Sequence, residues 1–222
     1  MVSVLEREMY TEAEAARLLR VPQSTLHYWL EGGTRRRRTY KPIIRVEPRG
    51  VRTVTWAEFV ESGWLREYRR EKVPMIELRR FIDEMRERFG VPWPLADRRP
   101  LVTGRELVFE AQAASGLDPD FFLVTTCGGK MMLTPPGDEF FRRVEFDGDL
   151  ATGYRPDRDP DSPVRILPGV RFGKPSIKGI STEVIWEHAE VGEDAEEIAE
   201  EFNLDTSDVS WALSYEYAQR AA

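Results

Sequence analysis

The sequence predicts an α+β protein with helices at both ends and short antiparallel strands between them. Three observations lead to this prediction: helix start signals occur at both ends, apolar residues follow a helical period over residues 11–31 and 56–89, and strand-like segments replace that period after closely spaced prolines. We expect three domains, at residues 1–99, 100–160 and 161–222, the last built from three helices.

The composition fits a folded protein outside the membrane. The 222 residues are 41% hydrophobic, which suffices to build cores, and they contain no run of about 18 apolar residues. Glu6 and Glu8 fall where a secretory signal would be basic and then apolar, so we expect a cytoplasmic location. The single cysteine, Cys127, cannot form a disulfide framework, and we expect it to be a buried thiol.

Charge is divided unevenly along the chain. Residues 1–100 hold 21 Lys/Arg and 15 Asp/Glu, a net charge of +6, whereas residues 101–222 hold 11 and 24, a net charge of −13. A basic end suits binding to a polyanion, and the acidic end suits another task.

A first helix is predicted to begin at Thr11. Thr11 and Glu14 form the capping-box pattern, in which each side chain accepts a hydrogen bond from the backbone N–H of the other residue. Ala15, Leu18 and Leu19 then recur at i, i+3 and i+4, so one side of this helix is apolar.

A second helix is predicted to begin at Pro22 and to end at Gly32. Its Leu26, Trp29 and Leu30 repeat the apolar spacing and should pack on the first helix. Two short helices joined by a tight turn form a helix-turn-helix, whose second helix fits the major groove of DNA. The candidate base contacts are polar residues of this helix: Gln23, Ser24, Thr25, His27 and Tyr28.

A run of cations follows the second helix and precedes a predicted β-hairpin. We expect the hairpin strands at residues 43–46 and 51–56, joined by a turn at 47–50. Cations beside a helix-turn-helix can neutralise phosphates, although charge runs are often no more than solvated loops. The candidate phosphate contacts are Arg35, Arg36, Arg37, Arg38, Lys41 and Arg45.

Residues 9–70 resemble the winged helix-turn-helix of MerR-type regulators. The resemblance rests on YTEAEAARLLRVPQSTLHYWLEGG, the predicted wing and WAEFVESGWLREYRR. The long dimerising coiled coil of that family has no counterpart in this chain. The resemblance therefore implies DNA binding but not a MerR-type effector mechanism.

The rest of the first half is predicted to change from helix to strand. Helices are expected at 56–70 and 74–89, the second with Met75, Leu78, Ile82, Met85 and Phe89 spaced by threes and fours. The small antiparallel middle module is then expected to contain strands at 106–112, 121–127, 130–134, 144–146 and 151–154, with a Gly128-Gly129 hairpin turn and a short helix after Pro135.

No assembled catalytic or metal-binding set is evident. His27 and His188 are the only histidines, so a zinc-peptidase signature or a Cys–His pair has too few residues. The acidic stretch 157–161 lacks the glycine and glutamate of a calcium loop, and 169–174 lacks the spacing of a phosphate loop. We therefore expect a protein that is not an enzyme and needs no cofactor or metal.

The acidic end is predicted to begin with a strand at 165–167 and an extended segment at 172–179. Pro175 favours extended geometry at Lys174, which would place Lys174 and Lys178 on the same side. Three helices should follow, starting at Ser181 or Thr182, at an Asp194–Glu197 capping box and at Thr206. The last helix is expected to bury Val209, Ala212, Leu213 and Tyr217.

The acidic end resembles the domain-of-unknown-function 433 family, which occurs in small bacterial proteins and antitoxins. Together with the amino-terminal module, the whole chain resembles VapB-type antitoxins of VapBC toxin–antitoxin modules. The family pattern G-T-R-I is replaced by Gly179-Ile180-Ser181-Thr182, so one basic contact is missing. The match is carried by Gly173, Lys174, Pro175, Ile177, Lys178, Gly179, Gly192, Glu197, Ile198, Ala199, Val209, Ala212 and Leu213.

The VapB resemblance implies two partners, operator DNA and a PIN-domain ribonuclease toxin, in a homodimer or hetero-oligomer. The toxin contacts it implies by position are Arg171, Phe172, Lys174 and Lys178. An alternative is that the two lysines only close the domain against its own acidic helices. The alternative function is a free-standing winged-helix transcriptional regulator without a toxin partner.

Overall fold

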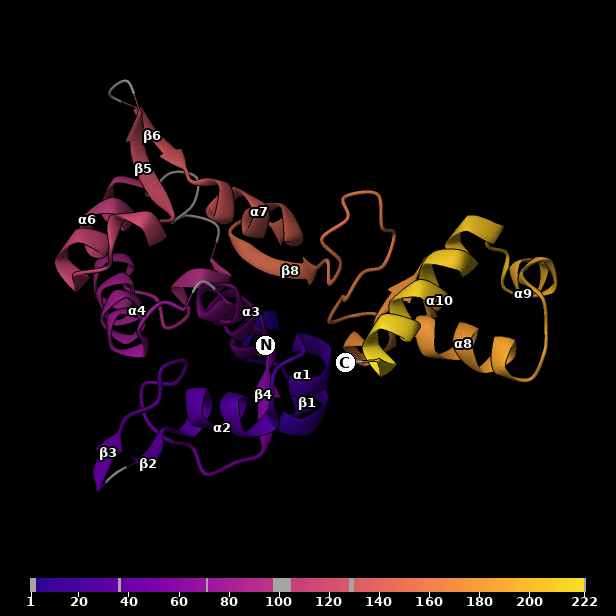
Figure 1. Cartoon of the computed structure of the whole chain (residues 1–222), viewed down its shortest axis with the longest axis horizontal. Coiled ribbons are helices and arrows are strands. Elements are labelled where there is room, and N and C mark those ends of the chain that lie inside the picture. Colours follow the sequence, from indigo (N-terminus) through magenta and orange to yellow (C-terminus); the bar gives the residue numbers. More distant parts are fainter. Residues whose placement is uncertain (1–2, 36, 71, 98–104, 128–129, 222) are drawn as a thin grey trace. The chain divides into compact units, whose positions relative to one another are not determined.

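The chain forms two compact units, which we call the amino unit (residues 1–151) and the carboxyl unit (152–222) (Figure 1). The computed structural model describes residues 3–35, 37–70, 72–97, 105–127 and 130–221. Sequence analysis expected three domains, whereas the middle stretch up to Ala151 belongs to the amino unit. None of the helices within these ranges is long and apolar enough to span a bilayer.

The fold is α+β, as predicted. Strands in the described residues occur only as two-stranded pairs, so the helices supply most of the framework. The pairs are β1 (Glu8–Thr11) with β4 (Thr53–Thr55), β2 (Gly33–Arg35) with β3 (Arg38–Tyr40), β5 (Val124–Cys127) with β6 (Lys130–Leu133), β7 (Val144–Asp147) with β8 (Leu150–Tyr154), and β9 (Ser176–Ile177) with β10 (Ile180–Ser181).

The predicted helix-turn-helix is present as α1 (Glu12–Leu19) and α2 (Gln23–Glu31). Thr11 and Glu14 form the expected capping box at the start of α1. The apolar residues predicted for both helices are buried, and they pack with α3 (Trp56–Arg70). They are Ala15, Leu18, Leu19, Leu26, Trp29 and Leu30.

The hairpin predicted at residues 43–56 is wrong. β4 pairs with β1 instead, with Thr11 opposite Thr53. Ile43 and Ile44 form no strand; they are buried, and both backbone N–H groups donate to the carbonyl oxygen of Trp29, at 2.9 and 3.0 Å. The chain uses this isoleucine pair to cover the end of α2, and the hairpin that follows α2 is β2–β3.

The helix predicted at 74–89 is α4 (Met75–Phe89), and it buries Leu78, Ile82 and Met85 as expected. Its neighbour is α6 (Arg105–Ser115), which lies beside α4 in Figure 1. Residues 106–112 were predicted to be a strand and are helical instead. Val108, Ala111 and Gln112 are buried and lie three and four residues apart, as on one face of a helix. In the sequence alone, an apolar run this short fits a helix and a strand equally well.

The middle stretch packs into the amino unit. Gln112 donates from Nε2 to the carbonyl of Val124 at 2.9 Å, which fastens β5 to α6. The Trp64 ring of α3 meets the Phe140 ring of α7 (Pro135–Arg143) with centroids 3.8 Å apart. Strands at 124–127, 130–133, 144–147 and 150–154 replace those predicted at 121–127, 130–134, 144–146 and 151–154, and Phe121 belongs to a 3-10 turn instead. The Gly128-Gly129 turn and the Cys127 side chain lie outside the described residues.

The carboxyl unit contains α8 (Thr182–Glu190), α9 (Ala195–Phe202) and α10 (Thr206–Arg220) around one apolar core. The Asp194–Glu197 capping box is confirmed, but α10 is capped by Asp205 and not by Thr206. α10 buries Val209 and Ala212 as predicted. Tyr217 is 69% exposed, and Tyr215 takes the buried position.

The segment before α8 is more irregular than predicted. Arg165 and Ile166 make only isolated bridges, to Ser176 and Tyr154. The segment 172–179 is not extended throughout, because Arg171 to Gly173 form a 3-10 turn with positive φ and the β9–β10 hairpin turns at Lys178. Within the described ranges, the other 3-10 turns are Val4–Glu6, Pro94–Ala96 and Pro119–Phe121.

Glu61 is a fully buried carboxyl group on α3. It accepts a hydrogen bond from the backbone N–H of Leu95 at 3.0 Å, and Arg86 lies 3.9 Å away. Burial raises the pKa of Glu61 to about 7, because the low-dielectric surroundings disfavour the charged form. The folded amino unit therefore holds a proton that the unfolded chain releases at lower pH.

We expect Glu61 to make the protein less stable as the pH rises from about 4.5 to 7. Its folded pKa lies above the unfolded value of 4.5, so the folded state binds the extra proton in this window and loses that advantage above it. Relative to Glu61→Gln, the parent protein should lose on the order of 3 kcal/mol of unfolding free energy between pH 5 and pH 8. Urea unfolding at both pH values measures this difference.

Glu87→Gln is the matched control for this measurement, because Glu87 is an exposed carboxylate on α4. It should follow the parent protein at both pH values. A Glu61→Gln variant whose stability changes with pH as the parent's does would show that Glu61 is already ionised in the folded state.

Candidate nucleic-acid interface

The outer face of α2 carries the predicted base contacts. Gln23 and Ser24 are exposed, whereas Thr25, His27 and Tyr28 are half-buried. The buried apolar residues lie on the other face, so polar groups of the first turns of α2 face solvent. A helix presented in this way can reach base edges in a major groove.

His27 is oriented by a buried glutamate. Its Nδ1 lies 2.9 and 3.2 Å from the two carboxylate oxygens of Glu12, whose side chain is only 1% exposed. Arg52 donates to the same carboxylate at 3.0 Å. Because a carboxylate accepts hydrogen bonds, we assign a proton to Nδ1 of His27. The other ring nitrogen, Nε2, makes no hydrogen bond with Glu12.

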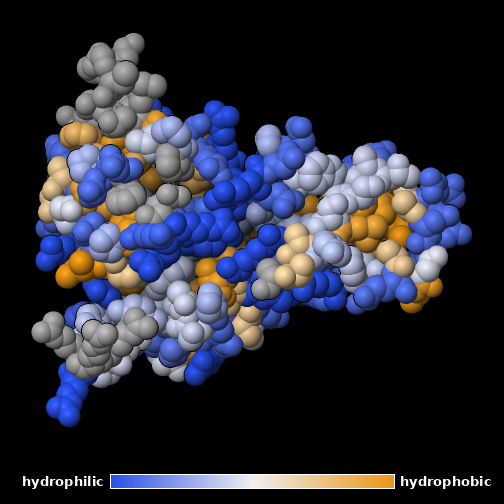
Figure 2. Space-filling model, in the orientation of Figure 1, coloured by the Kyte–Doolittle hydropathy of each residue, from blue (hydrophilic) through white to orange (hydrophobic). Residues whose placement is uncertain are grey.

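The arginine run closes the ribbon formed by β2 and β3. Arg35 pairs with Arg38 in the register, and Arg37 is an exposed turn residue with φ of 65°. The coloured, described part of the ribbon shows hydrophilic surface (Figure 2). Arg36 and the side chains of Arg35 and Arg38 lie outside the described residues. The described backbone pairs Arg35 with Arg38, and Arg37 lies between them.

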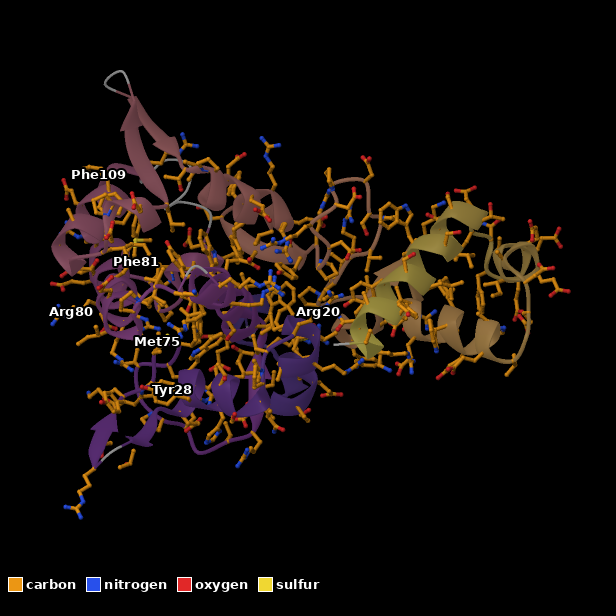
Figure 3. All side chains as sticks on the ribbon, viewed as in Figure 1. Arg20, Tyr28, Met75, Arg80, Phe81 and Phe109 are labelled. Atoms are coloured by element: carbon orange, nitrogen blue, oxygen red, sulfur yellow. The ribbon has the colours of Figure 1, made fainter. Side chains whose placement is uncertain are left out.

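Gly32 fixes how the ribbon leaves α2. It has φ of 71°, and a Cβ atom there would lie 2.2 Å from the carbonyl oxygen of Tyr40. Tyr28 of α2, labelled in Figure 3, contacts Tyr40 of β3 edge-to-face with ring centroids 6.4 Å apart. The close backbone approach and the aromatic pair hold the base of the ribbon, at Gly33 and Tyr40, close to α2.

We expect Gly32→Ala to destabilise the amino unit and displace the ribbon. The added Cβ would meet backbone atoms, which cannot move aside as a side chain can. Gly50→Ala is the matched control, because Gly50 also has positive φ (67°) but nothing lies within 4 Å of its Cβ position. Chemical unfolding should show a loss of about 1 kcal/mol for Gly50→Ala and at least about 3 kcal/mol for Gly32→Ala. Equal losses would rule out a steric role for Gly32.

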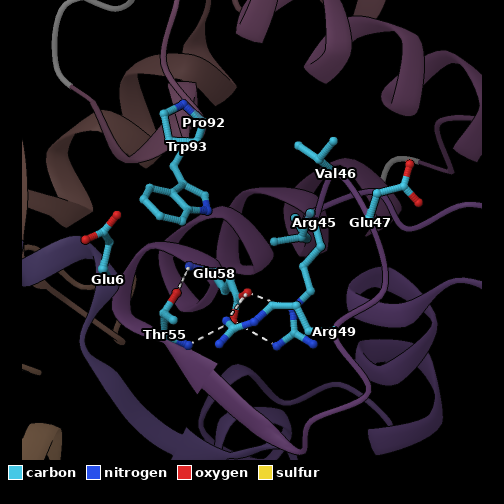
Figure 4. A pocket seen from close by; sticks show the side chains of 10 residues that line it. Glu6, Arg45, Val46, Glu47, Arg49, Thr55, Glu58, Pro92 and Trp93 are labelled. Atoms are coloured by element: carbon cyan, nitrogen blue, oxygen red, sulfur yellow. Dashed lines mark hydrogen bonds and ion pairs between the residues drawn. The ribbon is translucent and has the colours of Figure 1, made fainter.

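Arg45 does not lie where a phosphate contact was predicted. Its side chain is 3% exposed and donates to Glu58 at 2.7 and 3.0 Å (Figure 4). It is also paired with Glu31. Arg49 reaches the same Glu58 from a more exposed position, at 3.4 Å. Arg45 is therefore a structural cation beneath a pocket of about 390 Å³ lined by Val46 and Trp93, among others.

A recognisable signal for part of this network was overlooked. Thr55 and Glu58 form a second capping box, with hydrogen bonds of 2.9 and 3.3 Å between their backbone N–H groups and side chains. The same T-x-x-E spacing that predicted α1 therefore begins α3. No sequence pattern indicates that Glu58 is buried beside Arg45, because the two residues are 13 positions apart.

The segment after the ribbon is held by arginines of α4. Arg79 donates to the carbonyl of Lys41 at 2.9 Å, and Arg86 donates to that of Ile43 at 3.2 Å. The Lys41 side chain itself is 73% exposed, and its Nζ lies 2.9 Å from a carboxylate oxygen of Glu47. The hydrogen bond to Glu47 raises the pKa of Lys41. Sequence reasoning treated the apolar stripe of α4 as mostly packing and missed the supporting role of its arginines.

The four residues predicted to contact a toxin form two groups: two lysines bound to acidic residues of the same unit, and two exposed residues of one turn. Lys174 pairs with Glu183 at 2.7 Å, and Lys178 pairs with Asp205 and Asp208 at 2.8 and 2.7 Å. The hydrogen bond from Lys178 lowers the pKa of Asp205. Both lysines thus close the carboxyl unit against its own acidic residues, which is the alternative that sequence analysis left open.

Arg171 and Phe172 face solvent instead. Arg171 donates from Nε to the carbonyl of Gly179 at 2.8 Å, which ties the turn to the β9–β10 hairpin. Phe172 is 84% exposed and, like Arg171 and Gly173, has positive φ. Figure 2 also shows hydrophobic surface between hydrophilic residues on the visible face of the carboxyl unit.

Comparisons with known proteins give one family match in the amino unit and another in the carboxyl unit. Residues 8–82 match the family described as "Putative DNA-binding HTH domain", and residues 164–215 match "Protein of unknown function (DUF433)". The chain is 31% identical to the uncharacterized protein Rv2308 of Mycobacterium tuberculosis over 237 residues, covering 100% of this chain and 95% of the relative. The chain belongs to the family of that protein.

Two further relatives extend the comparison. "Putative antitoxin VapB45" of Mycobacterium tuberculosis is 28% identical over 190 residues, which cover 79% of each protein. The crystal structure of Rv2018 from the same organism matches with a TM-score of 0.76 at 24% identity, covering 94% of this chain and 99% of that one. This structural likeness shows that the fold is shared.

Proposed function

We propose that the chain is an antitoxin that binds operator DNA through its amino unit and neutralises a PIN-domain ribonuclease through its carboxyl unit. The observation that carries the DNA-binding half is the polar face of α2 set beside a ribbon that closes on four consecutive arginines. The similarity to "Putative antitoxin VapB45" supports the second half.

The charges support assigning DNA to the amino unit. The carboxyl unit has 7 Lys/Arg and 15 Asp/Glu, a net charge of −8, and would be repelled by a phosphate backbone. The amino unit is nearly neutral overall, with 25 Lys/Arg and 24 Asp/Glu. Its DNA contacts therefore depend on local placement: α2 for the bases and the arginine turn for phosphates. Lys41 would have to give up its ion pair with Glu47 to join them.

The side chains of the carboxyl unit support a narrower toxin contact than the sequence suggested. Lys174 and Lys178 already have carboxylate partners, so a toxin would have to displace those ion pairs to use them. Arg171 and Phe172 are exposed, and arginine and aromatic residues are common anchors of protein interfaces. We assign the toxin contact to this pair.

Two measurements separate this function from that of a free-standing regulator. An antitoxin should copurify with the product of an adjacent gene when both are expressed together, and it should shift its own promoter DNA in a gel assay. A regulator would shift the DNA but retain no partner, and expression of the adjacent gene alone would be harmless. Absence of any DNA shift, with or without partner, would refute both functions.

A further inference from the structure

Three side chains with metal-ligating atoms meet where α8 passes into α9. His188 lies in the last turn of α8, Glu193 follows the turn between the helices, and Glu201 lies on α9. The His188 Nδ1 is 2.7 Å from a carboxylate oxygen of Glu193 and 3.6 Å from one of Glu201. One ligand atom from each residue lies within 4.8 Å of the other two.

Local backbone geometry holds this cluster together. Gly192 has φ of 102°, a conformation that L residues rarely adopt, and the backbone N–H of Glu193 donates to the carbonyl of His188 at 3.3 Å. The His188 ring meets the Phe202 ring edge-on with centroids 4.9 Å apart, which limits rotation of the imidazole. The three ligating groups are thus prearranged by a glycine turn and an aromatic contact.

The electrostatic surroundings favour a cation. Residues 187–201 include eight Asp/Glu and no Lys or Arg, so His188 is the sole group in this stretch that can carry a positive charge. The carbonyl end of α8 adds partial negative charge in the same place.

We propose that His188, Glu193 and Glu201 form a site for a divalent transition-metal ion of the Zn²⁺ type. Zn²⁺ takes imidazole nitrogen and carboxylate oxygen at about 2.0–2.2 Å, and a tetrahedron of such bonds separates its ligand atoms by about 3.3 Å. The observed separations of 2.7 and 3.6 Å lie on either side of that value, so small side-chain movements create the site. Water completes the coordination.

The imidazole ligand determines which ions fit. Mg²⁺ and Ca²⁺ prefer oxygen ligands only, whereas imidazole with carboxylates suits Zn²⁺, Co²⁺ or Ni²⁺. A bound ion would join the end of α8 to α9 and add stability to the carboxyl unit through mass action. This site is independent of the proposed DNA and toxin contacts, because none of its residues belongs to either set.

The test is a calorimetric titration of the metal-stripped full-length chain with Zn²⁺ near pH 7.5. The parent protein should bind one ion at this site, and His188→Gln and Glu201→Gln should each weaken binding by about 10-fold or more. Glu190→Gln removes an exposed carboxylate from the same helix, and His27→Gln removes the other histidine. Both controls should bind within about 2-fold of the parent.

A second readout keeps the test informative if a variant folds poorly. Zn²⁺ should raise the thermal unfolding temperature of the parent protein, and Co²⁺ should give visible absorption bands that His188→Gln lacks; Mg²⁺ should do neither. The proposal is overturned if the parent shows no saturable Zn²⁺ binding, in which case the three residues form an ion pair only. It is equally overturned if Glu190→Gln or His27→Gln weakens binding as much as His188→Gln does.

Discussion

Replacing Arg35, Arg36, Arg37 and Arg38 together with alanine is expected to weaken DNA binding by a factor on the order of 10² to 10³ at every DNA sequence. Arg35 and Arg38 pair in the β2–β3 ribbon and Arg37 is exposed in its turn, where a guanidinium group can reach phosphates without reading bases. Each lost phosphate contact also removes one counterion release, which lowers the slope of log K against log salt by about 0.9.

Single substitutions supply the controls for this prediction. Arg37→Ala should lower the salt slope by about 0.9, whereas Arg142→Ala should leave it unchanged. Arg142 is a suitable match because it is 76% exposed in the same unit but lies on α7, away from α2. Fluorescence anisotropy over a range of salt concentrations measures both quantities. An unaltered slope in the fourfold variant would remove the ribbon from the DNA interface.

The helix termini of both units were predictable because their signals are local. A capping box joins residues three apart, and an apolar stripe joins residues three and four apart, so the chain itself brings the interacting groups together. Thr11, Asp194 and their glutamate partners behave in this way. The families matched at 8–82 and 164–215 cover these same helices.

Strand pairing was less predictable because it depends on distant partners. Thr53 pairs with Thr11 across the whole helix-turn-helix, and no pattern within residues 43–56 reveals that choice. The β2–β3 ribbon was overlooked because its turn is an arginine run, whose composition resembles a solvated loop. The α6 segment was assigned as a strand because a short apolar run fits both periods.

Charged side chains show the same limit at the candidate sites. Sequence identifies Arg45 as a cation beside a basic run, but Glu31 and Glu58 come from other elements and bury it. Lys178 is likewise neutralised by Asp205, 27 residues further along the chain. The sequence shows which residues are cations. Whether a cation is free to contact DNA or a partner protein depends on tertiary contacts that the sequence does not show.

Phe172→Ala is expected to weaken binding of the proposed toxin by about 30-fold or more, which corresponds to about 2 kcal/mol. Arg171 and Phe172 have positive φ, which is strained for residues other than glycine, and such strain persists only where surrounding contacts enforce it. Here the enforcing contacts include the Arg171 hydrogen bond to Gly179. The result is a rigid turn that presents a phenyl ring to solvent.

The energetic argument rests on preorganisation. The Phe172 ring is 84% exposed in the free chain, so inserting it into a partner's apolar pocket would remove most of its surface from water. Because the turn is already fixed, little conformational entropy is lost on binding. Truncating the ring should therefore speed dissociation, with little change in the association rate or in the stability of the free chain.

Two matched variants test whether Phe172 acts through position and not through hydrophobicity alone. Val191 and Tyr217 are also exposed in the carboxyl unit, at 79% and 69%, but neither lies on the strained turn. Val191→Ala and Tyr217→Ala should leave toxin dissociation within about 3-fold of the parent, whereas Phe172→Ala should not. Surface plasmon resonance with the purified partner measures these rates. If Phe172→Ala dissociates at the parent rate while DNA binding is intact, the toxin contact lies elsewhere on the carboxyl unit.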